Sequence, residues 1–491
     1  MKKLLGTALS AAVLLSSGPA NAELLKNLKV NGGLDLQMVT SRNVDDFSTH
    51  ATAAGVANND RQGGTLTRTW LSMGWDLLDD VHAKTTIRKN DRTWGTAGAG
   101  GQGAGTDQAI GAGGIQANIY VSEANVKIDK VFGHFDATLG RQYYGEAGDL
   151  IIYYGPKNNY GLVVTNIDAA RVDAANDWIG FSGLAGKTVG SAIGATAADV
   201  DVHGFDVGVK PMPIKTNAFV WRQITHATGA LGTPSNTALA AGTNDYLWVY
   251  GLKVKGEAMG GWAAVTVAAN AGQNRLQAAT AAPTSRSRSY SGKALLVDAG
   301  WKADVSGVGG FTPWLNFGWG SGQSSTLENR NEGFTAIASD YRPGLIYGKF
   351  DGAIAAGGLG NTSTPGTVSG AGLNNRVIWG VGLKVAPAAV SKLTAGLSYW
   401  DFRRQRATST TAAAPAGLGN KHIGSEIDVT LDWKHSDNVM FGVGAATFQP
   451  GGFVKESIQQ GNTTGVSGGT AGSGVGVSPV TALFGDVNIR F

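Results

Sequence analysis

The last thirteen residues, Pro479–Phe491 (PVTALFGDVNIRF), carry the pattern that decides the fold. Their apolar side chains alternate with polar ones, and only Phe484 departs from the order. The apolar face comprises Thr481, Leu483, Val487, Ile489 and Phe491, and the polar face comprises Asp486, Asn488 and Arg490. Alternation with a period of two predicts a β-strand with one apolar and one wet face. The same pattern also fits an edge strand of a soluble sheet.

The N-terminal segment predicts export. Met1-Lys2-Lys3 precedes the apolar run Leu4–Leu15, and Ala20-Asn21-Ala22 is a small-x-small cleavage site. The apolar run is shorter than the ~20 residues that a spanning helix needs. We expect a signal peptide at 1–22 and a mature chain at 23–491. In an exported chain, a final strand that ends on Phe resembles the C-terminal targeting strand of bacterial outer-membrane barrels.

Composition narrows the class of exported protein. The chain has no cysteine, which argues against a disulfide-stapled secreted scaffold. The formal charge is +4, of which the signal peptide carries two lysines, so nothing favours nucleic acid as a partner. Beyond the signal peptide there is no apolar run of spanning-helix length. The mean hydropathy of −0.05 suits a barrel whose strands alternate between lipid and water.

Segments of alternating polarity recur along the mature chain, joined by alternately short and long connections. We predict strands at 28–38, 65–76, 81–91, 119–128, 134–143, 162–171, 178–184, 205–210, 217–225, 246–255, 262–271, 290–302, 311–320, 376–385, 393–403, 422–434, 439–448 and 479–491. About 18 strands of this kind predict an all-β fold, a transmembrane antiparallel barrel with long extracellular loops and short periplasmic turns. A soluble solenoid or propeller would need a fixed repeat period, and none is present.

Tryptophans near the predicted strand ends are expected to form an interfacial girdle. They are Trp70, Trp75, Trp248, Trp301, Trp319, Trp379 and Trp433.

Two motifs resemble the alginate-export family of outer-membrane porins. One is ATLGRQYYG at 137–145, which is similar to the Gly-Arg-Gln motif of that family. The other is 424–451, which resembles the family's closing hairpin, with Glu426 and Asp428 as the Glu-x-Asp pair. The resemblance implies an 18-stranded barrel that acts as a channel. A strongly cationic lumen is expected of an alginate exporter, whereas the predicted lumen here carries both signs.

Charged residues on the polar faces of the strands are expected to line an aqueous pore, because a barrel of this size leaves a channel. The basic candidates are Arg68, Lys84, Arg88, Lys127, Lys253 and Lys255, and the acidic ones are Glu123, Glu426, Asp428 and Asp432. Each could equally pair across strands and stiffen the wall.

Arg141 and Gln142 have opposite parity. Strict alternation places Gln142 in the lumen and Arg141 on the lipid side with Leu139. A bulge at Gly140 would turn Arg141 inward, and a rim position near lipid headgroups is the alternative. We predict that both residues line the pore.

The long Gly-rich loops, chiefly 95–114 and 321–374, are candidates for a constriction or for external loops without fixed structure. We predict that one loop narrows the pore. The segment 345–354 within the second loop is only weakly strand-like.

Signals for catalysis are weak. Gly465–Gly469 fits Gly-x-Ser-x-Gly, but it lies in a Gly/Ser-rich loop without a strand-to-helix setting. The seven histidines have no metal-ligand spacing, so we expect no catalytic site, no metal and no cofactor. His82 and His422 are expected at the lumen or its rim.

The sequence therefore predicts a bacterial outer-membrane, porin-like channel, not an enzyme, for passive diffusion of small hydrophilic solutes or oligosaccharides. Its expected partners are outer-membrane lipid, lipopolysaccharide and those solutes, with a homo-oligomer left open. The alternatives are the barrel sheath of an export or electron-transfer assembly, and an outer-membrane hydrolase.

Overall fold

The computed structural model describes 26–43, 61–93, 119–157, 159–160, 162–189, 199–209, 214–226, 244–274, 288–322, 330–349, 372–407, 419–459 and 478–491. The predicted signal peptide and the Gly-rich loop 95–114 lie outside these residues.

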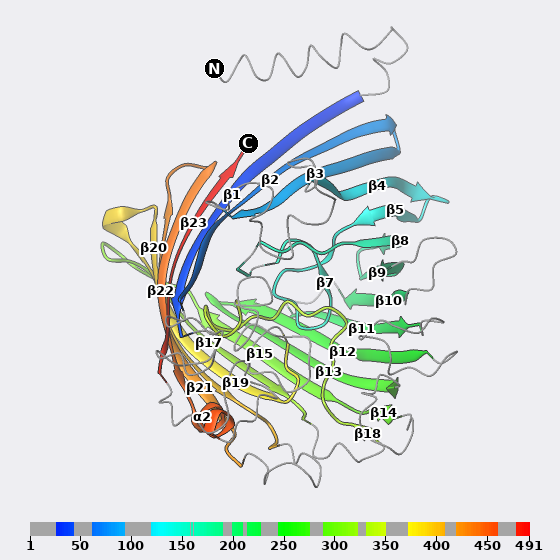
Figure 1. The fold of residues 1–491 in the computed structure, drawn as a ribbon. Helices are drawn as coiled ribbons and strands as arrows, with labels where there is room; N and C mark the ends of the chain where they lie inside the picture. Colours follow the sequence, from blue (N-terminus) through cyan, green and yellow to red (C-terminus); the bar gives the residue numbers. More distant parts are fainter. Residues whose placement is uncertain are drawn as a thin grey trace, which may run out of the picture.

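The described residues contain eighteen wall strands in one closed antiparallel sheet (Figure 1). In chain order the strands are β1 (Lys26–Arg42), β2 (Arg61–Leu78), β3 (Val81–Thr93), β4 (Ile119–Val131), β5 (Phe135–Gln142), β8 (Ile167–Ala175), β9 (Ile179–Val189), β10 (Val200–Val209), β11 (Ile214–Thr225), β12 (Asp245–Ala258), β13 (Gly261–Asn274), β15 (Lys293–Trp301), β17 (Gly309–Gly320), β19 (Arg376–Pro387), β20 (Leu393–Arg403), β21 (His422–Lys434), β22 (Val439–Pro450) and β23 (Val480–Arg490).

Consecutive wall strands pair with one another, and the C-terminal strand closes the ring. β23 pairs antiparallel with β1, from Gly33 opposite Arg490 to Arg42 opposite Thr481. Short β16 (Ala303–Val305) continues β15 along β17, and β14 (Arg288–Tyr290) pairs antiparallel with the end of β13. A closed sheet has no unpaired edge, which is the condition for a β structure to cross a bilayer.

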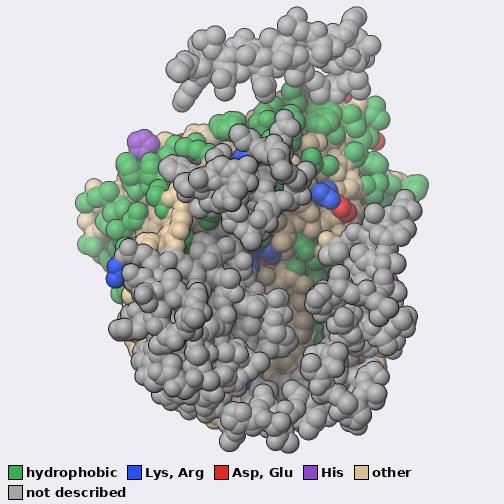
Figure 2. All heavy atoms as spheres, in the orientation of Figure 1, with side chains coloured by type: hydrophobic (Ala, Val, Ile, Leu, Met, Phe, Trp, Pro, Cys, Tyr) green, Lys and Arg blue, Asp and Glu red, His purple; other side chains and the backbone are tan. Residues whose placement is uncertain are grey.

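Alternation along each strand separates an outer apolar face from the lumen. On β1, Leu28, Val30 and Met38 are each about 45% exposed on the outside, whereas Asp35 and Gln37 are buried on the inside. Apolar side chains gather over the described part of the outer surface (Figure 2). This belt is the face that meets lipid.

The two ends of the barrel differ in their connections. At the end that holds the N-terminus of β1, strands are joined by short turns, such as Met259 and Gly260 between β12 and β13. Both turn residues have positive φ (49° and 79°), the backbone of a tight hairpin turn that matches strand twist. Long connections leave from the opposite end, which we call the extracellular end; the short-turn end is the periplasmic end.

All eighteen predicted strands are present, which confirms the predicted fold class. β8 differs most from its prediction, since it starts at Ile167 and not at Leu162. The weakly strand-like segment from Leu345 is not a strand in its described part, 345–349. Among the described helices, which include α2 (Gly452–Gln459), none is long and apolar enough to span a membrane.

The predicted tryptophan girdle needs one correction. Trp248, Trp301, Trp379 and Trp433 are exposed on the outer face, as expected. Trp70 instead belongs to the lumenal face of β2, where Arg88 and Arg490 lie over its ring at 5.8 Å and 5.7 Å.

Candidate functional site

Two segments between wall strands fold into the barrel. The first inner segment is 143–166, between β5 and β8, and it contains β6 (Tyr144–Gly145) and β7 (Tyr153–Tyr154). The second inner segment is 330–349, which begins with β18 (Arg330–Asn331). β7 lies inside the ring of wall strands (Figure 1). Both segments bury apolar side chains, among them Ile151 and Ile346, which are fully buried.

The inner segments are hydrogen-bonded to each other along their backbones. Tyr153 N donates to Ala338 O (2.9 Å), and Ala338 N donates to Ile151 O (3.0 Å). Asp340 N donates to Asp149 O at 2.8 Å. Ile152 and Ala338 form a parallel bridge. The two segments therefore behave as one inner body.

Wall side chains on several strands hold this inner body in place. Arg68 Nη1 on β2 donates to Leu162 O (3.2 Å). Asn270 on β13 exchanges two hydrogen bonds with the backbone of Thr335 (2.8 and 2.9 Å). Tyr341 donates its hydroxyl hydrogen to Asn316 Oδ1 on β17 at 2.6 Å.

Glu426 on β21 anchors the second inner segment with two hydrogen bonds. Its two carboxylate oxygens accept the backbone N–H groups of Ile346 (2.7 Å) and Tyr347 (2.9 Å). Gly344, with φ of +78°, turns the chain so close to Glu426 that a Cβ there would be 2.9 Å from the carboxylate. Two hydrogen bonds from consecutive backbone N–H groups to one side chain fix this end of the second inner segment.

Burial of the inner body affects the ionisation of its tyrosines. Burial, helped by the charge of Asp340, raises the pKa of Tyr153 to about 12. Burial likewise raises the pKa of Tyr160 and Tyr341. These phenols stay neutral at ordinary pH, as an apolar filling requires.

The inner body therefore narrows the extracellular half of the barrel, where the sequence alone predicted an aqueous channel throughout. Inward apolar residues of the wall join the inner body in one buried cluster. They include Val39, Ile167, Leu184, Val202, Phe219, Trp221, Val249, Leu296, Ile378, Phe402, Ile423 and Phe448. This cluster packs the inner body against the wall and narrows the extracellular half of the lumen.

Half of the predicted pore-lining residues are buried in the extracellular half of the barrel. They are Arg68, Arg88, Glu123, Gln142, Glu426 and Asp428. Arg68 forms an ion pair with Asp35 (2.7 Å), and Arg88 Nε donates a hydrogen bond to the hydroxyl oxygen of Tyr143 (2.8 Å). These side chains support the wall and the inner body.

Five predicted residues lie toward the periplasmic half and remain accessible: Lys84, Lys127, Lys253, Lys255 and Asp432. Lys84 pairs with Glu123 (2.9 Å), and Lys127 pairs with Asp129 (2.6 Å). Lys253 pairs with Asp149 of the first inner segment. Lys255 is exposed and stands opposite Lys215 in the β11–β12 register.

Arg141 does not line the lumen, so that part of the prediction is wrong. Gly140 has the unusual φ of +117°, but the β4–β5 register continues through it without a shift. Arg141 therefore keeps the outward parity of Leu139. It is held by the Asp168 carboxylate on β8, with Nε–Oδ1 and Nη2–Oδ2 distances of 2.8 and 2.9 Å.

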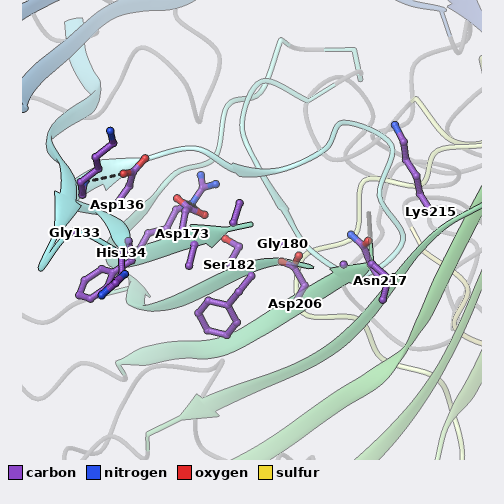
Figure 3. Close-up of a pocket in the computed structure, with 17 residues that line it drawn as sticks. Gly133, His134, Asp136, Asp173, Gly180, Ser182, Asp206, Lys215 and Asn217 are labelled. Atoms are coloured by element: carbon purple, nitrogen blue, oxygen red, sulfur yellow. Dashed lines mark hydrogen bonds and ion pairs between the residues drawn. The ribbon is translucent and has the colours of Figure 1, made fainter. Parts of the chain in front are cut away.

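A recess of about 710 Å³ opens in the periplasmic half of the lumen, at the ends of β5 and β8–β11 (Figure 3). Polar side chains line it, chiefly Asp136, Arg171, Asp173, Ser182, Asp206, Lys215 and Asn217. Arg171 pairs with Asp173 at 2.7 Å and lies 5.3 Å over the Tyr144 ring. Tyr144 donates its hydroxyl hydrogen to Asp206 Oδ2 at 2.8 Å. The recess offers planar polar groups of both signs to a solute.

The functional residues that the sequence prediction missed are those of the first inner segment. The run Leu150–Tyr154 is apolar although it stands between two strands, and that was the available signal. Loops that remain in water rarely carry such a run.

The described residues contain no group of three or more His, Asp or Glu that could hold a metal ion. His82 lies between Asp76 (2.5 Å) and Asp129 (2.9 Å) near the periplasmic end, and His422 contacts Asp401 (3.1 Å). Gly465–Gly469 lies outside the described residues.

Comparison with known proteins gives a partial match to one family model and several solved structures of similar fold. The alginate export family model matches 360–466, which includes the second motif at 424–451. No curated protein matches the sequence.

Three solved structures from Pseudomonas aeruginosa are similar in fold. OccK8 (OprE) has a TM-score of 0.52 at 11% identity, covering 95% of this chain and 99% of its own. OccK9 (OpdG) has 0.51 at 11%, covering 95% and 100%. OccK11 (OpdR) has 0.50 at 8%, covering 96% and 98%. By its closed sheet and outer apolar belt this chain is a bacterial outer-membrane β-barrel, similar over 360–466 to the alginate export family.

Proposed function

We propose that this protein is a size-restricting channel for small hydrophilic solutes, with a filter in its extracellular half and a water-filled vestibule in its periplasmic half. The observation that carries the proposal is the inner body, whose two segments are bonded to each other and to several wall strands. Such a body leaves little room for a polymer, so small solutes are the favoured cargo.

The charges of the vestibule support a weak preference for anions. Most accessible lysines there are paired with carboxylates, so the opposite charges largely cancel. Lys215 and Lys255 face each other across two strands and form no ion pair with a described residue. Like charges at paired positions repel, and a passing anion relieves that repulsion.

The polar recess supports a transient resting place for solutes. Its carboxylates, Arg171 and Asn217 provide both acceptors and donors, the mixture that recognises uncharged polar molecules such as sugars. The proposal assigns no catalysed reaction to the barrel.

Export of an anionic polysaccharide is a second candidate, favoured by the match to the alginate export family. It would require the inner body to leave the lumen, because the inner body narrows the extracellular half.

The test compares the barrel 23–491 with a variant in which 334–347 is replaced by a Gly/Ser linker. Single-channel conductance in planar bilayers and liposome swelling with sugars of increasing size are measured for both. We expect small conductance with a sharp size limit for the unmodified barrel, and a severalfold larger conductance with a relaxed limit for the variant. Equal conductance and equal size limits would refute the filter. Permeation of alginate oligomers through the unmodified barrel would favour the export candidate.

A further inference from the structure

The outer face of the barrel carries a groove that the channel function does not use. It has a volume of about 520 Å³ and crosses β21, β22, β23 and β1 in their extracellular halves. These four strands lie side by side (Figure 1). Because the groove is on the apolar belt, its occupant must come from the membrane or from a protein within it.

The register shows why the surface is hollow here. Thr447 on β22 stands opposite Ile427 on one side and Thr481 on the other. One step toward the periplasm, Ala445 stands between Val429 and Leu483. Small side chains thus form a floor between large exposed ones.

Arg42 closes the extracellular end of the groove with a positive charge. It is the last residue of β1, is exposed, and is paired in register with Thr481. Other outward basic residues at this end have carboxylate partners, such as Arg141 with Asp168 and Lys187 with Asp199. Arg42 forms no ion pair with any residue that the structure describes.

Arginine is the side chain best suited to phosphate, because its planar fork of N–H donors matches the phosphate oxygens.

We infer that this groove binds the lipid A part of lipopolysaccharide, with one acyl chain along the floor of small residues and a phosphate at Arg42. The position at the extracellular end selects the outer leaflet, where that lipid resides. Lipid tails around the barrel are as apolar as the groove, so the hydrophobic effect does not select the occupant. Selection comes from close packing in the groove and from the charge at its end.

Native mass spectrometry of the refolded barrel 23–491 with added lipid tests the inference. The probes are diphosphoryl lipid A, the same lipid without its phosphates, and phosphatidylglycerol. We expect one tightly held diphosphoryl lipid A, and weaker binding of the other two lipids. Arg42→Gln should weaken lipid A binding about tenfold, the size of one charged hydrogen-bonding group. Arg42→Lys should retain part of the affinity.

Matched variants separate the site from general effects. Ala445→Phe fills the groove and should also weaken lipid A binding about tenfold, whereas Ala263→Phe makes the same change on the exposed outer face of β13 and should not. Lys293→Gln removes an exposed charge at the extracellular end of β15, away from the groove, and should leave binding unchanged.

The gel-mobility shift on heating confirms that each variant is folded. Unchanged binding in Arg42→Gln or in Ala445→Phe would overturn the site. Phosphatidylglycerol bound as tightly as lipid A would overturn the choice of occupant. If Arg42→Gln weakened binding of the dephosphorylated lipid as much as binding of diphosphoryl lipid A, the role of the charge would be overturned.

Discussion

Glu426 is an inward-facing carboxyl group whose hydrogen bonds hold the inner body. It lies on the inward face of β21, and both of its oxygens accept N–H groups of the second inner segment. A charged side chain that faces a lumen therefore need not act on solutes. The sequence gives the direction of the side chain, whereas its partner belongs to a segment 79 residues or more away along the chain.

Replacing Glu426 by Ala should loosen the inner body. Two hydrogen bonds are lost, about 1–3 kcal/mol of local stability. We expect a larger and noisier single-channel conductance. Asp432→Ala, an exposed change on the same face of the same strand, is the control and should leave the noise unchanged. A quiet, unaltered Glu426→Ala channel would contradict the anchoring role.

The backbone conformation at position 140 requires a glycine there. With φ of +117° it adopts a conformation that side chains avoid, and a Cβ would lie 2.3 Å from Ala124 O. Gly140→Ala should lower the free energy of unfolding by about 2 kcal/mol or more. Gly74→Ala, whose Cβ would meet its nearest atom at 3.8 Å, is the matched control. Urea unfolding followed by tryptophan fluorescence measures both, and equal midpoints would refute the requirement.

At the scale of elements, wall strands were predictable and inner segments were not. A strand between lipid and water shows its two faces in its own sequence, as β1 and β23 do. Leu162 was placed in a strand because of the apolar residues that follow it, yet it has φ of 54° and its carbonyl accepts from Arg68. Whether an apolar run becomes a wall strand or an inner segment depends on which residues it pairs with across the barrel. The alternation of polarity along the chain carries no information about that pairing.

The buried tyrosines make a pH prediction for the inner body. Because the pKa of Tyr153 is raised to about 12, the neutral phenol stabilises the folded state. That contribution is complete below the ordinary tyrosine pKa of about 10 and is lost as the pH rises through 12. Absorbance at 295 nm should show one group of tyrosines ionising near pH 10 and a second group only at higher pH. Ionisation of all tyrosines near pH 10 in the folded barrel would contradict a dry inner body.

At the scale of the molecule, the prediction of an 18-stranded barrel was confirmed, and the inner body that narrows one half of it was not predicted. The count of strands sets the width of the ring. What fills the ring is set by the connections between Gln142 and Ile167 and between Gly320 and Arg376, whose lengths alone do not say whether they point outward or inward.

Charge selectivity should respond to the lysine pair in the vestibule. We expect the unmodified barrel to be weakly anion-selective in a salt gradient. Lys255→Glu should shift the permeability ratio toward cations about two- to threefold, since one unit charge in water acts over a few ångströms before salt screens it. Lys293→Glu, on the outer face of β15, should not change the reversal potential. The same shift in both variants would mean that the effect is not lumenal.

The inner body narrows the extracellular half of the lumen and leaves the periplasmic half wider, and this asymmetry has an electrical consequence. Ions that approach from the periplasm enter a charged chamber before they reach the narrow part, whereas ions from outside reach it directly from bulk solution. The local supply of ions at the barrier therefore differs between the two directions, because a charged cleft raises the concentration of counter-ions within it. We therefore expect the current through the barrel at one polarity of voltage to exceed the current at the other.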